Sequence, residues 1–229
     1  MSNDLRFERP AVLTVERRKL DSWFRRPAFY HELSSIQFIT KLIGDEGRFV
    51  DRERAEHDDS VMQIVAYGVV RFDRRILCVK RAKKSNRRVL RLKHTILFGG
   101  HVDSLEEGVS DPLEKCLLRE LDEELGISPT IRPQLLGTVF DPTTHVGRLH
   151  LGLIFDSVVE SKEIAPQRGL DDAEFVHSGR RRTRLLQPID EIIHFEFDPW
   201  SSLFLASDMA AELLGQRRPI VPQLTFGFE

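Results

Sequence analysis

The chain contains 229 residues with a formal net charge of −2 at pH 7; 41% of them are hydrophobic and 31% are charged. This composition is typical of a globular protein and excludes a disordered chain, and the length allows one or two domains. The small net charge gives no overall basic surface for nucleic acid. No long apolar run predicts a signal peptide or a membrane span, so we expect a cytoplasmic protein.

Residues 1–60 are interpreted as an N-terminal extension that packs on a core domain of residues 61–229. The extension contains a predicted amphipathic helix at 31–43, whose apolar residues recur every three or four positions, and Gly44 is expected to end it. Acidic residues are interleaved with its basic pairs. We therefore interpret these pairs as solvated surface in preference to a nucleic-acid arm.

The next segments have the pattern of β-strands. Strands are predicted at 63–70 and 75–80, joined by a short turn at 72–74. The basic segment 81–91 is interpreted either as a solvated hairpin tip or as a cationic rim beside a phosphate site. A strand at 90–98 then leads into Gly99-Gly100, a predicted turn whose backbone carbonyls can approach a metal ion or a phosphate.

A helix with marked ends follows the Gly-Gly pair. Asp111 is a favourable N-cap, Pro112 occupies the first turn, and Gly126 follows the last turn. An apolar stripe recurs at every fourth position and predicts a buried face, with Leu113, Leu117, Leu121 and Leu125 as its members.

Three carboxylates lie beside this stripe. Glu120, Glu123 and Glu124 fall within an arc of roughly 100° on the helix. Glutamates with this spacing usually form a solvated face. The preceding Gly-Gly pair and acidic loop favour a site for a hard divalent cation, because Mg²⁺ and Mn²⁺ prefer oxygen ligands.

The remainder of the chain continues the mixed pattern. Strands are predicted at 134–140, 148–159 and 173–176, and helices at 187–193 and 200–214. The basic cluster 179–184 is interpreted as a solvated loop in preference to a phosphate contact. Strands on both sides of the central helix predict a mixed sheet covered by helices, in the α/β class. Cys78 and Cys116 are expected to be small core residues.

The stretch from Gly100 to Ile127 resembles the signature of the Nudix hydrolases, GX5EX7REUXEEXGU, in which U is aliphatic. Gly100 and Glu106 match its front half, and the run from Arg119 to Ile127 matches its rear half in identity and spacing. Twelve residues separate Glu106 from Arg119 where the signature has seven, so we expect a bulged loop of five extra residues before the helix. Counting back from Arg119 instead places the first signature glutamate at Asp111, so the sequence leaves both candidates open.

The resemblance implies a Nudix-like α/β/α sandwich and the metal-dependent hydrolysis of a diphosphate linkage in a nucleoside diphosphate derivative. The implied cofactor is Mg²⁺ or Mn²⁺. The metal ligands that the resemblance implies on this chain are the Gly99 carbonyl and the carboxylates of Glu120, Glu123 and Glu124.

Glu120, Glu123 and Arg119 are the implied catalytic residues. Arg119 either orients a carboxylate of the signature or forms a surface pair with Glu123. The candidates for substrate binding are Gly100, His101 and Arg91. His101 could contact a substrate phosphate or only donate to a loop carbonyl. The general base is left open, because the four further candidates are each interpreted as structural: Asp141, His145, His150 and Glu174.

Two other functions are kept beside hydrolysis. One is a Nudix-like module that binds a nucleotide without turnover, and the other is an RNA-directed enzyme of the decapping type. More narrowly, the chain resembles a Nudix branch of predicted phosphoesterases in its Gly99-Gly100-His101 tripeptide and its Trp200-Ser201 pair. A small nucleotide-type substrate is the expected partner. Neither a membrane nor a nucleic acid is expected, and a homodimer is left open.

Overall fold

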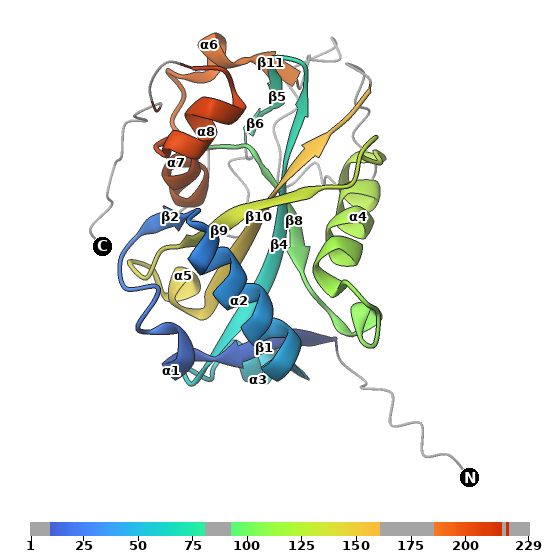
Figure 1. Cartoon of the computed structure of the whole chain (residues 1–229), viewed down its shortest axis with the longest axis vertical. Helices are drawn as coiled ribbons and strands as arrows, with labels where there is room; N and C mark the ends of the chain where they lie inside the picture. The colour runs from blue at the N-terminus through green and yellow to red at the C-terminus, as the bar shows by residue number, and fades with distance from the viewer. Residues whose placement is uncertain (1–9, 81–92, 161–185, 217–218, 220–229) are drawn as a thin grey trace.

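The computed structural model describes residues 10–80, 93–160, 186–216 and 219 (Figure 1). Within these ranges a nine-stranded mixed β-sheet lies between two layers of helices. The α/β/α sandwich and the mixed sheet that we expected are therefore confirmed. No helix in this part of the chain is both long enough and apolar enough to cross a bilayer.

Strand β4 (Val61–Phe72) is the centre of the sheet. It pairs in parallel with β10 (His150–Val158) along one edge. Three shorter strands pair antiparallel with its other edge in succession, namely β1 (Ala11–Glu16), β8 (Leu97–His101) and β5 (Arg75–Leu77). The remaining strands are β2 (Ala28–Tyr30), β3 (Arg48–Asp51), β9 (Gln134–Phe140), β11 (Leu186–Pro188) and the separate pair β6 (Val79–Lys80) and β7 (His94–Thr95).

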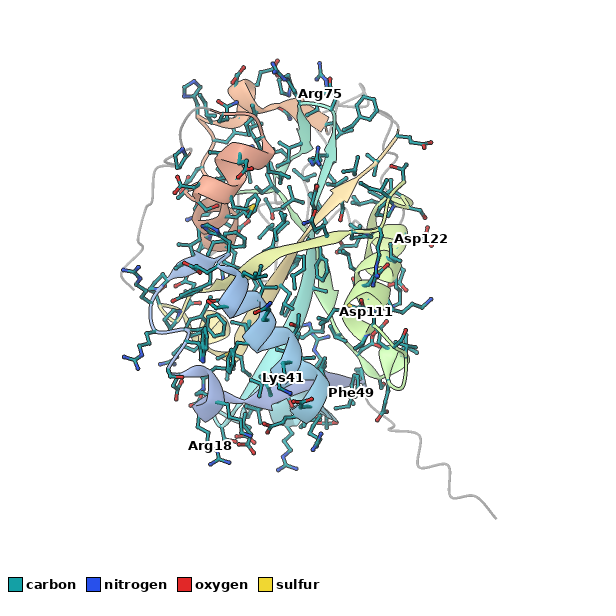
Figure 2. All side chains as sticks on the ribbon, in the orientation of Figure 1. Arg18, Lys41, Phe49, Arg75, Asp111 and Asp122 are labelled. Atoms are coloured by element: carbon teal, nitrogen blue, oxygen red, sulfur yellow. The ribbon has the colours of Figure 1, made fainter. Side chains whose placement is uncertain are left out.

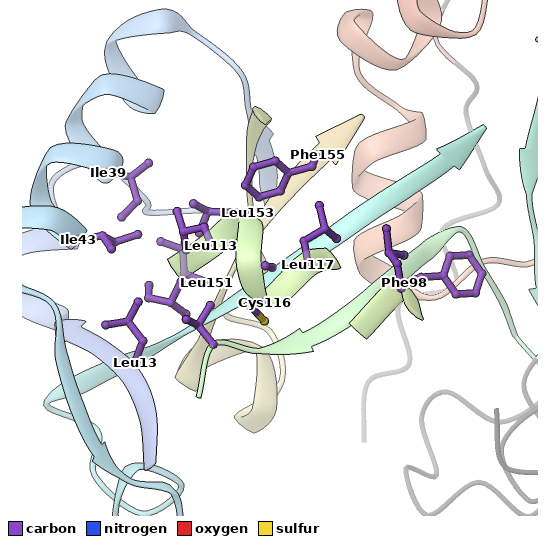
Figure 3. Packing of buried hydrophobic residues seen from close by; sticks show 14 of the residues in the cluster. Leu13, Ile39, Ile43, Phe98, Leu113, Cys116, Leu117, Leu151, Leu153 and Phe155 are labelled. Carbon is purple, nitrogen blue, oxygen red and sulfur yellow. The ribbon is translucent and has the colours of Figure 1, made fainter. Parts of the chain in front are cut away.

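The two faces of the sheet have separate hydrophobic cores. Alternate residues of β4 and β10 face α2 (Leu33–Glu46) and α4 (Pro112–Leu125), and Figure 3 shows side chains of both helices meeting over these strands. The intervening residues face the second helical layer, which contains α6 (Ile189–Ile192), α7 (Pro199–Leu205) and α8 (Asp208–Leu213). Shorter helices are α1 (Arg17–Leu20), α3 (Arg52–Ala55), α5 (His145–Leu149) and the 3-10 helix η2 (Ser104–Glu106).

The N-terminal part of the chain is built into this architecture. Residues 10–60 supply β1, β2 and β3 to the sheet and α2 to one helical layer. Ile39, Leu42 and Ile43 of α2 belong to the same buried cluster as the leucines of α4. The division at residue 60 into an extension and a core domain remains a prediction, and the contacts across it are those of a shared core.

Three predicted helix boundaries were wrong. The helix predicted at 187–193 starts only at Ile189, because Gln187 and Pro188 belong to β11. Helix α2 continues through Gly44 to Glu46, and Gly47 follows it, its N–H donating to the Ile43 carbonyl at 2.9 Å. The packing of Ile43 and Leu42 outweighs the cost of an internal glycine, which is about 1 kcal/mol. The helix predicted at 200–214 is two helices, because the Ser207 side chain accepts a hydrogen bond from Ala210 N–H and caps α8.

Two predicted strand boundaries were also wrong. Gly99 and Gly100 lie inside β8 instead of forming a turn, and both are paired with β4. Arg148 and Leu149 belong to α5, so β10 starts only at His150. Alternation in the sequence identified the strand but could not detect the single helical turn before it. Predictions for segments 81–91, 173–176 and 179–184 lie wholly or largely outside the described residues.

Candidate active site

Helix α4 begins and ends at the residues that the sequence predicted. The Asp111 side chain accepts a hydrogen bond from Glu114 N–H at 3.1 Å, and Pro112 occupies the first turn. Gly126 ends the helix in the left-handed region with a φ of 62°, where a glycine carries no steric penalty. The leucine stripe is buried against β4 and β8, and this packing fixes which face of the helix carries its carboxylates.

The segment before α4 is a loop, as the extra residues in the signature predicted. Glu106 ends the 3-10 helix η2, and residues 107–110 form no regular helix before Asp111 caps α4. The helix therefore keeps its register, and the additional length is accommodated between η2 and α4.

Arg119 is the centre of a cluster of carboxylates. Its Nε donates to Glu106 at 2.8 Å, and its Nη1 donates to Glu120 at 2.8 Å and to Glu123 at 3.2 Å. Its Nη2 donates to Asp103 at 3.3 Å. Burial alone would lower the pKa of the guanidinium, but the hydrogen bond with Glu106 and the charge of Glu120 raise that pKa. One cation faces four carboxylates, so the cluster retains excess negative charge.

The structure places Glu106, and not Asp111, against Arg119. The Glu106 side chain is only 1% exposed, and its second oxygen accepts a hydrogen bond from Asp103 N–H at 2.9 Å. Asp111 caps α4 and pairs with Arg132 at the surface, at 2.9 Å. The sequence alone had not decided whether Glu106 or Asp111 is the first glutamate of the signature. It had not identified Asp103 as a partner of Arg119, although Asp103 and Glu106 have the spacing of a capping box, which the structure contains.

Gly100 and Glu120 approach each other so closely that no side chain fits between them. A Cβ atom on Gly100 would lie 2.5 Å from Glu120 Oε1. Burial raises the pKa of the Glu120 carboxyl above its ordinary value, which the nearby Arg119 partly offsets. Gly99 has a φ of 141°, and a Cβ there would lie 2.1 Å from the Ala66 carbonyl oxygen. Both glycines are therefore required by the geometry of β8.

The donor chemistry of this cluster suits a divalent cation. Its carboxylates are hard oxygen ligands, they exceed the single positive charge of Arg119, and Glu120 is largely withdrawn from water. Among the described residues, however, no three His, Cys, Asp or Glu side chains converge on one point as a preformed metal site. Two of the three predicted carboxylates, Glu120 and Glu123, are instead bound to Arg119. The metal site therefore remains a prediction.

His101 lies on the opposite face of the sheet from Gly100. It is paired with Val65 of β4, while Gly100 is paired with Ala66 and faces α4. The Nε2 atom of His101 is 3.0 Å from Nε2 of His150, which starts β10 and is 8% exposed. This pairing was not predicted. No sequence pattern links the two histidines, because they lie on two strands, β8 and β10, that pair with opposite edges of β4.

The other candidates for the site are not brought to the cluster. Asp141 is buried and accepts hydrogen bonds from the backbone N–H and hydroxyl of Thr143, at 3.0 and 2.7 Å, as a turn-forming side chain does. Arg91 and Glu174 lie outside the described residues, as does the side chain of His145.

Both cysteines are free and buried, as expected. Burial raises the pKa of the Cys78 thiol to about 12 and also raises the pKa of the Cys116 thiol, to which the charge of Glu106 adds. The Cys116 Sγ donates to the His101 carbonyl at 3.2 Å and therefore joins α4 to β8. Neither thiol is suited to act as a nucleophile.

Comparison with known proteins supports these observations. The family model of the NUDIX domain matches residues 62–206. Protein YmaB of Bacillus subtilis (strain 168) is 29% identical over 129 residues, and the match spans 55% of this chain and 63% of YmaB. The crystal structure of Tm1382, described as a candidate Nudix hydrolase, has a TM-score of 0.64 and 21% identity, and covers 90% of this chain and 98% of its own. The chain therefore belongs to the NUDIX domain family.

Proposed function

We propose that this chain is a metal-dependent hydrolase that cleaves a diphosphate linkage in a nucleoside diphosphate derivative. The observation that carries the proposal is the cluster of carboxylates around Arg119, which lies within the matched family segment and directly beside Gly100. Excess negative charge destabilises a fold but favours the binding of a cation. The cluster also lies against a strand with no room for a side chain at Gly100, and a bound cation there could in turn hold an anionic substrate.

The proposed ligands of Mg²⁺ or Mn²⁺ are the Gly99 carbonyl and the carboxylates of Glu120, Glu123 and Glu124. A divalent cation bound there polarises phosphoryl oxygens and offsets the negative charge of the leaving phosphate. Arg119 holds Glu120 and Glu123 on one side of α4, and Glu106 in turn fixes the guanidinium. Glu106 and Arg119 thereby reduce the conformational freedom that metal binding would otherwise have to remove.

Substrate binding is proposed for Gly100 and His101, with Arg91 as a further cationic contact. The pairing of β8 with β4 uses one edge of β8. Gly100 faces the α4 carboxylates on one face of the sheet, and the His101 ring lies on the opposite face, beside His150. A module that binds a nucleotide without turnover is the alternative, and the retained carboxylates of the signature count against it.

The test is hydrolysis of a panel of nucleoside diphosphate derivatives, with phosphate release measured in the presence of Mg²⁺ or Mn²⁺. We expect at least one derivative to be cleaved, with activity abolished by EDTA and restored by excess Mg²⁺. Capped RNA in the same panel tests the decapping alternative. Metal-dependent binding of the derivatives with no turnover would favour the binding module, and full activity after complete removal of the metal would contradict the proposal.

A further inference from the structure

A cavity of about 530 Å³ lies between α2, β3 and the first turn of α4. Buried residues of the core that α2 and α4 share form its apolar floor, namely Leu13, Ile43, Leu113 and Phe155 (Figure 3). The partly buried side chains of Phe49 and Leu135 extend this apolar surface. Protein interiors normally leave few voids larger than a water molecule, whereas a hollow of this volume with an apolar lining is typical of a small-molecule site.

Two walls of the cavity come from features that lie outside the catalytic half of the family signature. One wall is α2, which precedes the residues 62–206 that the family model matches. The other wall is the loop between η2 and α4, in which the extra length of the signature is accommodated. Gly108, Val109 and Ser110 of this loop line the cavity. Val109 is 40% exposed, so it places an apolar side chain in contact with water at the opening.

The cavity is distinct from the cluster around Arg119. Of the four described carboxylates in that cluster, Glu106 lines the cavity. One oxygen of Glu106 accepts from Arg119 Nε at 2.8 Å, and the other accepts from Asp103 N–H at 2.9 Å. Glu106 therefore closes the cavity on that side, and the charge of a ligand has to be recognised by other groups.

Those other charged groups are two carboxylates and one guanidinium. Arg132 Nε donates to Glu114 at 2.6 Å, and its Nη2 donates to Asp111 at 2.9 Å. The Arg132 side chain is 72% exposed, while that of Glu114 is only 20% exposed. The acid therefore lies deeper than the cation that it binds, and one negative charge of the three groups is left without compensation. This charge balance favours a cationic ligand and disfavours an anionic one.

From these observations we propose that the cavity binds an amphipathic organic cation, a small molecule with an apolar or aromatic body and one ammonium group. The body covers the floor of core residues. The ammonium group stays at the wet opening beside Glu114 and Asp111, as the charged ends of long side chains do at protein surfaces. This site does not depend on the proposed hydrolysis.

Three probes with one apolar body test the charge preference. At pH 7, 4-phenylbutylamine is cationic, 4-phenylbutanol is neutral and 4-phenylbutyrate is anionic. Titration calorimetry should show that the amine binds about fivefold more tightly than the alcohol, the gain of one partly exposed ion pair, and that the butyrate binds most weakly. Methyl resonances of Ile43 and Leu113 should shift as the amine saturates the chain. Equal affinities, the reverse order, or methyl shifts centred elsewhere would overturn the inference.

Substitutions separate recognition of the charge from recognition of the body. Glu114→Gln should weaken binding of the amine about fivefold, to the level of the alcohol, and leave binding of the alcohol unchanged. Thr40→Trp, on the α2 wall, should fill the cavity and weaken both probes by tenfold or more. Lys41→Trp is the matched control, because Lys41 is the next residue of α2, its side chain is 76% exposed, and it does not line the cavity.

Binding to Thr40→Trp as tight as to the wild type, or an equal loss in Lys41→Trp, would contradict the assignment of the cavity. Melting temperatures identify any variant that fails to fold, and Glu114→Gln, an exchange near the surface, keeps the test available in that case. Sedimentation of the ligand-free chain tests another occupant. A dimer that Thr40→Trp dissociates would make a second copy of the chain the occupant and overturn the inference. None of these measurements needs turnover, so absence of hydrolysis would refute the proposed function alone.

Discussion

The identity of the acid that holds Arg119 can be tested by substituting the two candidates in parallel. Glu106→Gln keeps the size of the side chain but leaves only one oxygen. In the structure, one Glu106 oxygen accepts from Arg119 Nε at 2.8 Å and the other accepts from Asp103 N–H at 2.9 Å. The amide can satisfy only one of these two donors, and its NH₂ group then faces the other.

The expected loss in the free energy of unfolding depends on how deeply the Glu106–Arg119 pair is buried. Breaking a buried ion pair costs about 3–5 kcal/mol when the remaining charge is left without a partner. Arg119 retains Asp103, Glu120 and Glu123, so the loss should be nearer that of one hydrogen bond to a charged group, about 1.5–3 kcal/mol. For a chain of this size the melting temperature should fall by about 3–12 °C.

Asp111→Asn is the matched control. Asparagine caps helices as well as aspartate does, and the lost pair with Arg132 is a surface pair, with the Asp111 side chain 42% exposed. We expect a change in the free energy of unfolding below about 0.5 kcal/mol. Urea unfolding followed by tryptophan fluorescence measures both variants. A larger loss for Asp111→Asn than for Glu106→Gln would refute the assignment of Glu106 to Arg119.

Three further predictions concern the same region. Gly100→Ala should lower hydrolysis by about 10²-fold and should also lower the melting temperature, because its Cβ would force the Glu120 carboxylate away from its position beside Arg119. Gly44→Ala, with nothing within 4 Å of its Cβ, should leave activity unchanged. Burial raises the folded-state pKa of Glu120, so the protonated side chain stabilises the metal-free chain at low pH and this contribution is lost as the pH rises through that pKa. Glutamine resembles the protonated acid at every pH. The melting temperature of Glu120→Gln minus that of the wild type should therefore be larger at pH 7 than at pH 4. Both thiols should resist a thiol reagent at pH 8 in the folded chain and react fully in urea, and rapid reaction of either in the native state would contradict their burial.

Much of the site could be predicted from sequence because it depends on local signals. The caps at Asp111 and Gly126 and the leucine stripe are local to one helix, so its ends and its apolar face can be read from the sequence of that helix alone. The spacing of Arg119, Glu120 and Glu123 likewise places them together on any regular helix.

The remaining features depend on contacts between distant segments. The contacts of Glu106 and Asp103 with Arg119 require the loop before α4 to fold back, and its extra length left two alignments equally consistent with the signature. The hydrogen bond of His101 with His150 depends on β8 and β10 both pairing with β4. Gly99-Gly100 looked like a turn because glycine pairs usually form one. Here the close approach of Ala66 and Glu120 explains the glycines within a strand.

The most direct test of the account compares hydrolysis by Glu123→Gln with hydrolysis by Asp122→Asn. The two positions are adjacent and exposed on α4, and the labelled Asp122 in Figure 2 marks this part of the helix. Glu123→Gln removes a proposed metal ligand that contacts Arg119 at 3.2 Å, whereas Asp122→Asn removes the same charge from outside the cluster. Using the derivative that the wild-type chain cleaves best, we expect Mg²⁺-dependent phosphate release to fall by about 10²-fold or more in Glu123→Gln and by less than about twofold in Asp122→Asn, with similar melting temperatures. Unchanged release by Glu123→Gln, or an equal loss in both variants, would contradict the claim that this face of α4 carries the catalytic site.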